Sequence, residues 1–154
     1  PIVHLLFSTP LCVREPLFMS CNRSTPDNPI EWLNRAASDL VLANNHIEDV
    51  YLEDLCFHAQ QCVEKSFKAI LLLKIGSFPY THDLAVLAGL LEKMDLDVPD
   101  CFRPAVRLTR YAVQARYPGV DEPVEEEQWQ FSVQTAQAIL TWAQNIVRNH
   151  SCSI

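Results

Sequence analysis

Hydrophobic and polar residues follow one another with helical spacing along most of the chain after residue 27. In the segment DNPIEWLNRAASDLVLANNHIE, Asn28 is a good helix cap and Pro29 suits the first helical position, while Glu31 can reach back to the cap. The apolar residues that then recur at helical spacing are Trp32, Leu33, Ala37, Leu40 and Val41. This pattern predicts a first helix that begins near residue 29.

The segment YLEDLCFHAQQCVEKSFKAILLLKIG has the strongest helical pattern in the chain. Its wide apolar face consists of Leu52, Leu55, Ala59, Cys62, Val63, Phe67, Ile70 and Leu71. Glu64 and Lys68 are one helical turn apart, so we expect them to pair on the outer surface. Gly76 is expected to end this helix.

Two further helices are predicted in the middle of the chain. The first lies in THDLAVLAGLLEKMDL, where Thr81 is the expected N-cap and the apolar residues are Leu84, Leu87, Ala88 and Leu91. The second runs from about Cys101 to Arg116, and Pro118 and Gly119 are expected to stop it.

The last helix has a heptad seam formed by Trp129, Val133, Ala136, Leu140, Ala143 and Val147. From Gln128 to Val147 the sequence contains no charged residue, although a solvated helix face usually carries Lys and Glu. Two explanations are open at this point. The helix is buried on more than one side within one subunit, or it also packs against a second subunit.

These patterns together predict an all-α, up-and-down bundle of about five helices. No segment alternates as a β-hairpin would, and only three glycines are available for tight turns. The bundle is expected to span residues 28–148, with a tail at 149–154. Residues 1–27 are expected to be a disordered or non-native extension, whose apolar part is too short for a membrane span.

Charge and cysteine usage narrow the possible functions. The chain has 19 acidic and 12 basic residues, and this excess of negative charge argues against non-specific binding to duplex nucleic acid. Six cysteines occur without a C-x-x-C pair, which favours reduced thiols in a cytoplasmic protein and predicts neither a metal site nor a cofactor. His58 and Cys62 are one helical turn apart, but two ligands do not make a metal site; we interpret His58 as a packing or hydrogen-bonding residue.

Arginines are concentrated in one part of this acidic chain, because four of the eight fall within residues 103–116. On a continuous helix, one face would carry Arg103, Arg107, Arg110 and Gln114. Guanidinium groups bind phosphates, and a neighbouring tyrosine can stack on a base. The predicted phosphate-contacting residues are therefore Arg107, Arg110, Arg116 and Tyr117. The alternative is that the arginines pair with the protein's own acids, including those at 125–127.

Three separated segments, YLEDLCFHAQQCVEKSFKAILLLKIG, THDLAVLAGLL and ARYPG, resemble a HEPN domain in order and spacing, over about residues 30–148. The resemblance implies a helical bundle that is commonly a homodimer. It also implies a frequent pairing with a minimal nucleotidyltransferase in bacterial two-gene, toxin–antitoxin-like systems. Some members of the family are RNA-cleaving toxins.

The sequence departs from the ribonuclease members of that family at one motif. Those proteins carry an arginine that is followed four to six residues later by a histidine, and no arginine in this chain meets that requirement. His82, in THDL, is a candidate ligand contact. A histidine in a loop before a helix is more often a structural hydrogen-bonding residue, so a role as acid/base is less favoured. We therefore expect a non-catalytic module that binds a nucleotide, single-stranded RNA or a partner protein. A ribonuclease with an atypical acid/base is the alternative.

Overall fold

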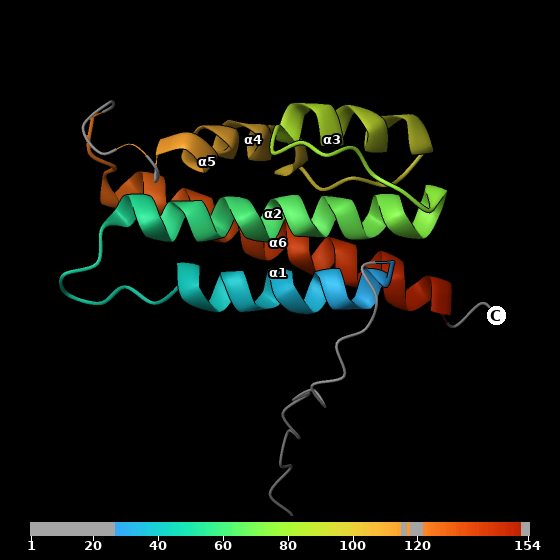
Figure 1. The fold of residues 1–154 in the computed structure, drawn as a ribbon, viewed down its shortest axis with the longest axis horizontal. Helices are drawn as coiled ribbons and strands as arrows, with labels where there is room; N and C mark the ends of the chain where they lie inside the picture. Colours follow the sequence, from blue (N-terminus) through green and yellow to red (C-terminus); the bar gives the residue numbers. More distant parts are fainter. Residues whose placement is uncertain (1–26, 115–116, 118–121, 152–154) are drawn as a thin grey trace, which may run out of the picture.

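The computed structural model describes residues 27–114, 117 and 122–151, so the expectations for residues 1–26 and for the last three residues lie outside it. Figure 1 shows a bundle whose helical elements are α1 (Pro29–Ala43), α2 (Leu52–Ile75), α3 (Leu84–Leu91), η1 (Glu92–Met94), α4 (Phe102–Ala105), η2 (Val106–Arg110), α5 (Tyr111–Gln114) and α6 (Glu126–Ser151). The described residues contain no strand, and the predicted all-α bundle is confirmed.

The two long N-terminal helices begin and end largely as the sequence predicts. Asn28 caps α1, because its side-chain oxygen accepts a hydrogen bond from the backbone N–H of Ile30 at 2.9 Å. Glu31 pairs with Arg35 at 3.1 Å rather than with the cap. α2 ends at Gly76, whose φ of 73° lies in the left-handed region that glycine adopts at little cost.

α2 is the central helix of the bundle, since it contacts α1, α3, α5 and α6. Its buried face meets an aromatic cluster in which the ring centroids of Phe67 and Phe102 are 5.1 Å apart and those of Phe102 and Trp142 are 5.4 Å apart. The largest fully buried aliphatic side chains around this cluster are Ile70, Leu71, Leu84, Leu87, Leu91, Leu108 and Ile139. This continuous core fixes the positions of the shorter helices above α2 (Figure 1).

The predicted cap of α3 is wrong by two residues. Asp83 is the N-cap, and its side chain accepts a hydrogen bond from the N–H of Ala85 at 2.8 Å. The Thr81 hydroxyl instead accepts from the N–H of Asp83 at 3.1 Å, within the turn that precedes the helix. The N–H of Leu84 donates to Thr109 Oγ1 at 3.1 Å, which ties the start of α3 to η2.

The predicted fourth helix is not a continuous α-helix, because the 3₁₀-helix η2 separates α4 from α5. Its buried side chains recur every three residues, at Phe102, Ala105, Leu108 and Tyr111. Three residues per turn is the period of a 3₁₀-helix, so this spacing keeps the whole apolar set against the core. The predicted end of this helix, at 115–116, lies outside the described residues.

α6 buries its predicted seam, with Ala136, Leu140, Ala143 and Val147 inside the core and Trp129 and Val133 partly buried. Its opposite face is exposed and uncharged, and consists of Gln130, Phe131, Gln134, Gln137, Thr141 and Asn145. α6 contacts α1, α2 and α4 and is thus buried on more than one side within one subunit, but this burial does not explain the missing charges on the exposed face. Among the described residues, no helix has both the length and the apolar character needed to cross a bilayer.

Candidate functional site

Two of the predicted arginines line a cavity between η2 and the first turns of α6. The cavity has a volume of about 340 Å³ and is lined by Arg107, Leu108, Arg110, Tyr111, Glu127, Gln128 and Phe131. Because η2 has three residues per turn, Arg107 and Arg110 stand directly above one another on its outer side. The cavity thus combines two guanidinium groups with two aromatic rings.

A second cavity of about 360 Å³ adjoins the first. It is lined by Arg110, Gln114, Glu122, Pro123, Glu125 and Gln128, so the two cavities share Arg110 and Gln128. The first cavity has two guanidiniums and a single carboxylate, that of Glu127. Its net positive charge favours the binding of an anion. The second has two carboxylates, and the buried side-chain oxygen of Gln114 has no hydrogen-bond partner in the described structure. That side of the site suits groups that donate hydrogen bonds, such as amines or hydroxyls.

The two cavity arginines keep most of their donors available. Within the described ranges, no carboxylate lies at ion-pair distance from Arg107 or Arg110. The guanidinium carbon of Arg110 is 4.8 Å from the centroid of the Tyr111 ring, which holds it over that ring. Burial raises the pKa of Tyr111, so its phenol stays protonated at neutral pH. The alternative that acids 125–127 neutralise these arginines in ion pairs is not what the described residues show.

The other residues of the predicted arginine face are not gathered at this cavity. Arg103 instead bonds Glu92 at 3.1 Å and lines neither cavity, because the 3₁₀ turn between it and Arg107 takes the two side chains off a common face. Tyr117 is exposed and its N–H donates to the Gln114 carbonyl at 3.3 Å, but it lines neither cavity. Arg116 lies outside the described residues.

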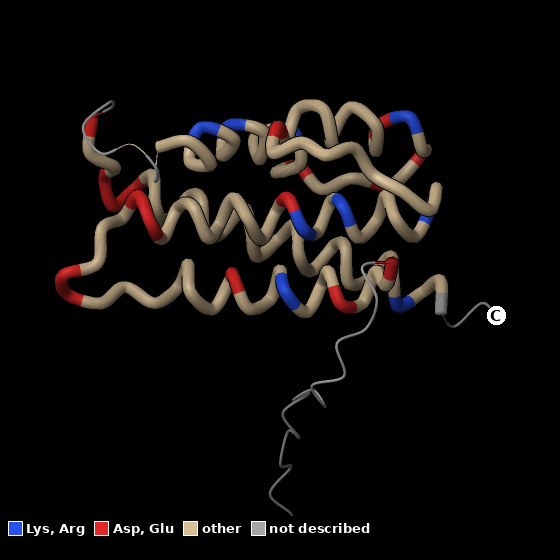
Figure 2. Tube along the Cα trace, viewed as in Figure 1, with Lys and Arg blue, Asp and Glu red and all other residues tan. Residues whose placement is uncertain are grey.

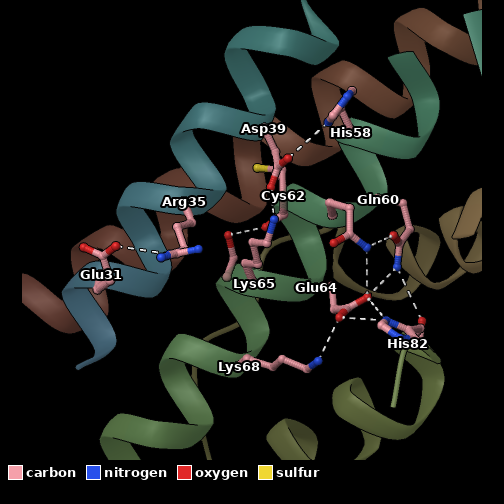
Figure 3. A network of polar contacts seen from close by, with 12 residues as sticks. Glu31, Arg35, Asp39, His58, Gln60, Cys62, Glu64, Lys65, Lys68 and His82 are labelled. Carbon is pink, nitrogen blue, oxygen red and sulfur yellow. Dashed lines mark hydrogen bonds and ion pairs between the residues drawn. The ribbon is translucent and has the colours of Figure 1, made fainter. Parts of the chain in front are cut away.

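His82 lies in a separate polar cluster beside the middle of α2 (Figure 3). Its Nδ1 is 3.1 and 3.2 Å from the two carboxylate oxygens of Glu64, and the ring is largely exposed on its other side. His82 lines neither of the two cavities, so the structure does not bring it together with Arg107 and Arg110.

Glu64 is the buried centre of this cluster, and its expected position on the outer surface is wrong. Its oxygens accept hydrogen bonds from Lys68 Nζ at 2.8 Å, from Gln60 Nε2 at 2.9 Å and from Gln61 Nε2 at 3.3 Å. Burial alone would raise the pKa of the Glu64 carboxyl, but the bonds from Lys68, Gln60 and His82 outweigh it and lower the pKa below its ordinary value. The carboxylate is therefore ionised at neutral pH.

Lys68 is buried for a reason that helical spacing does not reveal. Its ammonium lies 5.9 Å from the ring centroid of Trp32 in α1 and 5.3 Å from that of Phe78 in the connection to α3. These two rings, which contact each other edge to face, cover the face of α2 that the sequence pattern placed in solvent. The Glu64–Lys68 pair is thus a buried ion pair.

A second set of charged side chains joins α1 to α2. Asp39, which is buried in α1, bonds His58 Nδ1 at 3.1 Å and also pairs with Lys65 (Figure 3). The predicted hydrogen-bonding role of His58 is confirmed. Cys62 is fully buried nearby, and burial raises its pKa to about 12, so the thiol stays protonated. Among the described residues, no group of three or more His, Cys, Asp or Glu side chains is placed to hold a metal ion.

A family model and one solved structure identify the family, and two further proteins are similar to this chain. The family model of the HEPN domain matches residues 30–146. A protein of Methanocaldococcus jannaschii named "Putative toxin MJ1304" is 28% identical over 130 residues, which cover 75% of this chain and 81% of that protein. The crystal structure of ST0689, an archaeal HEPN homologue, has a TM-score of 0.60 and 27% identity, and the match covers 78% of this chain and 98% of that one. The crystal structure of TT1696 from Thermus thermophilus has a TM-score of 0.60 and 26% identity, and the match covers 76% of this chain and 96% of that one.

Proposed function

Because this chain belongs to the HEPN domain family, we propose that it is a non-catalytic module that binds a nucleotide or single-stranded RNA in a toxin–antitoxin-like system. The name of the Methanocaldococcus jannaschii relative supports the toxin-like setting. A minimal nucleotidyltransferase is the proposed protein partner, since the family resemblance implies that pairing. The bundle is proposed to act as a homodimer.

The observation that carries the binding proposal is the cavity at Arg107 and Arg110. The two guanidiniums supply charge-assisted hydrogen bonds for a phosphate, while the partly exposed Phe131 offers apolar surface for a base or sugar. The adjoining cavity places acceptor groups where a nucleoside presents amino or hydroxyl donors. The protein's negative net charge restricts polyanion binding to such a local positive site.

Two observations support a module that does not cut its ligand. No arginine in the sequence has a histidine four to six residues after it. His82 lines neither cavity, so a phosphate bound between Arg107 and Arg110 has no histidine beside it among the described residues. General acid–base catalysis requires the proton acceptor within hydrogen-bond reach of the reacting hydroxyl.

Binding measurements with arginine variants test this proposal. We expect ATP or a short single-stranded RNA to bind the unmodified protein in isothermal titration calorimetry. Arg107→Gln and Arg110→Gln should each weaken that binding by about ten- to a hundredfold, because each removes a charge-assisted hydrogen bond. The matched control is Arg103→Gln, which lies in the same segment but pairs with Glu92. Absence of binding, or equal loss in the control, would contradict the proposal.

A second candidate function, RNA cleavage, is favoured by the contact between His82 and Glu64. A buried carboxylate that holds Nδ1 leaves Nε2 of an exposed histidine free to act as a base. It would take the proton of a ribose 2′-hydroxyl as that oxygen attacks phosphorus, and water would protonate the departing 5′-oxygen. End-labelled RNA on a denaturing gel decides the matter: cleavage that His82→Gln abolishes would establish this candidate, and intact RNA would exclude it.

A further inference from the structure

The last turn of α1 and the connection that follows it expose several large hydrophobic side chains. Within residues 41–51, five such side chains are between 37% and 75% exposed, namely Val41, Leu42, Ile47, Val50 and Tyr51. Val41 is among them although its helical spacing predicts a buried position. Exposed apolar residues gathered in one place on a folded domain mark a surface that contacts something else.

This connection is held in place by several contacts rather than left loose. Trp129 in α6 donates from its indole nitrogen to the Ala43 carbonyl at 2.8 Å, and its ring lies 4.8 Å from the ring of His46. The N–H of Val50 donates to the Ile47 carbonyl at 3.2 Å. The exposure of these side chains is therefore a property of the folded state, and a partner would meet a surface that is already formed.

The same end of the bundle is strongly acidic. No Lys or Arg occurs from residue 36 to residue 64, and Glu48, Asp49 and Asp54 are exposed beside the apolar side chains. Glu53 accepts a hydrogen bond from the N–H of Val124 at 2.8 Å, which brings the segment before α6 to the same end. That segment and the first turn of α6 add the exposed acids Glu122, Glu125, Glu126 and Glu127, and Figure 2 shows the acidic residues collected there.

We propose that this acidic–apolar end, made by residues 41–54 and flanked by the acids of 122–127, is a docking surface for a protein segment that carries both apolar and basic side chains. The exposed side chains supply apolar contact, and the surrounding carboxylates attract Lys and Arg on the partner. The same charge disfavours the other occupants. A second copy of this end would place carboxylate against carboxylate, and nucleic acid or an anionic membrane would be repelled.

Residues 41–54 line neither of the two cavities at Arg107 and Arg110, and the test leaves the cavity residues Glu122, Glu125 and Glu127 unchanged, so it does not depend on nucleotide binding. The probes are three synthetic 14-residue peptides with one amphipathic pattern, built from Leu and Lys, from Leu and Glu, and from Ser and Lys. We expect the Leu–Lys peptide to bind at least tenfold more tightly than the other two, because only it offers both kinds of contact. Chemical-shift changes in the protein's NMR spectrum should centre on residues 41–54.

Variants of the protein then distinguish peptide binding at this surface from general electrostatic attraction of a basic peptide to an acidic protein. Val41→Ser combined with Tyr51→Ser should weaken binding of the Leu–Lys peptide by about tenfold, because both side chains are exposed contacts. The matched control is Tyr80→Ser, which changes a fully exposed tyrosine in the connection between α2 and α3. Equal binding of the Leu–Glu peptide, an unaffected double variant, or shift changes elsewhere would overturn the proposal. So would binding to anionic vesicles, or self-association that the double variant removes.

Discussion

At the scale of single residues, the buried pair of Glu64 and Lys68 departs most clearly from expectation. The i, i+4 spacing correctly indicates that the two side chains meet, but it carries no information about what covers them. Trp32 and Phe78, which enclose Lys68, come from two other parts of the chain. Long-range contacts of this kind cannot be read from helical periodicity.

Glu64→Gln should destabilise the fold by about 3 kcal/mol, because it leaves the Lys68 ammonium buried without its counter-charge. Urea denaturation followed by circular dichroism measures the free energy of unfolding. The matched control is Glu92→Gln, which removes one partner of the exposed pair with Arg103 and should change stability by less than about 1 kcal/mol. Similar losses of unfolding free energy in both variants would show that the buried Glu64–Lys68 pair contributes no more to stability than an exposed pair.

The stabilities of the unmodified protein and of Glu64→Gln should also depend differently on pH. The pKa of Glu64 is lowered in the folded state, so its contribution to stability is complete above the ordinary glutamate pKa of about 4.3 and is lost as pH falls through the folded value. The difference in unfolding free energy between the unmodified protein and Glu64→Gln should therefore shrink below about pH 4.3. A difference that stays constant down to acid unfolding would mean that the carboxylate is not the stabilising form.

At the scale of helical elements, the ends of helices were more predictable than their internal geometry. Asn28, Pro29 and Gly76 act locally, through caps and backbone conformation, and the structure uses all three as expected. The break of residues 102–114 into α and 3₁₀ pieces was missed, although the apolar residues Phe102, Ala105, Leu108 and Tyr111 recur with the 3₁₀ period. That error matters to the site, because it separates Arg103 from Arg107 and Arg110.

Replacing glycine by alanine should have opposite effects on stability at two positions. Gly76→Ala should cost about 1 kcal/mol, since φ is positive there while no atom would crowd the added Cβ. Gly89→Ala, inside α3, should stabilise by about 0.5–1 kcal/mol because the position is open and helical. Thermal unfolding of both variants is the measurement. A gain at Gly76 or a loss at Gly89 would contradict the backbone explanation.

At the scale of the whole molecule, the uncharged face of α6 has no covering element among the described residues of one subunit. The sequence indicated this face through its missing charges, and the structure shows Gln134, Gln137 and the apolar Phe131 exposed along it. Which molecule covers it is a property of an assembly, and no pattern within one chain determines it. A homodimer through α6 is the proposed answer.

Sedimentation velocity tests the dimer. The unmodified protein should sediment as a dimer at micromolar concentration. Gln134→Glu combined with Gln137→Glu should shift it toward monomer, because a symmetric interface would bring the new carboxylates close to one another. Ser77→Glu, an exposed position between α2 and α3, is the control and should leave the dimer intact. A monomer without any substitution would exclude the proposed assembly.

The location of the bound ligand is the most direct test of the proposed function. The measurement is an NMR titration of the isotope-labelled protein with a short single-stranded RNA, in which backbone amide shifts report the contact surface. We expect the largest changes within residues 107–111 and 127–131, the two segments that supply the lining of the arginine cavity, with little change at Glu64 and His82. Shifts centred on His82, or no shift at any RNA concentration, would contradict binding at Arg107 and Arg110.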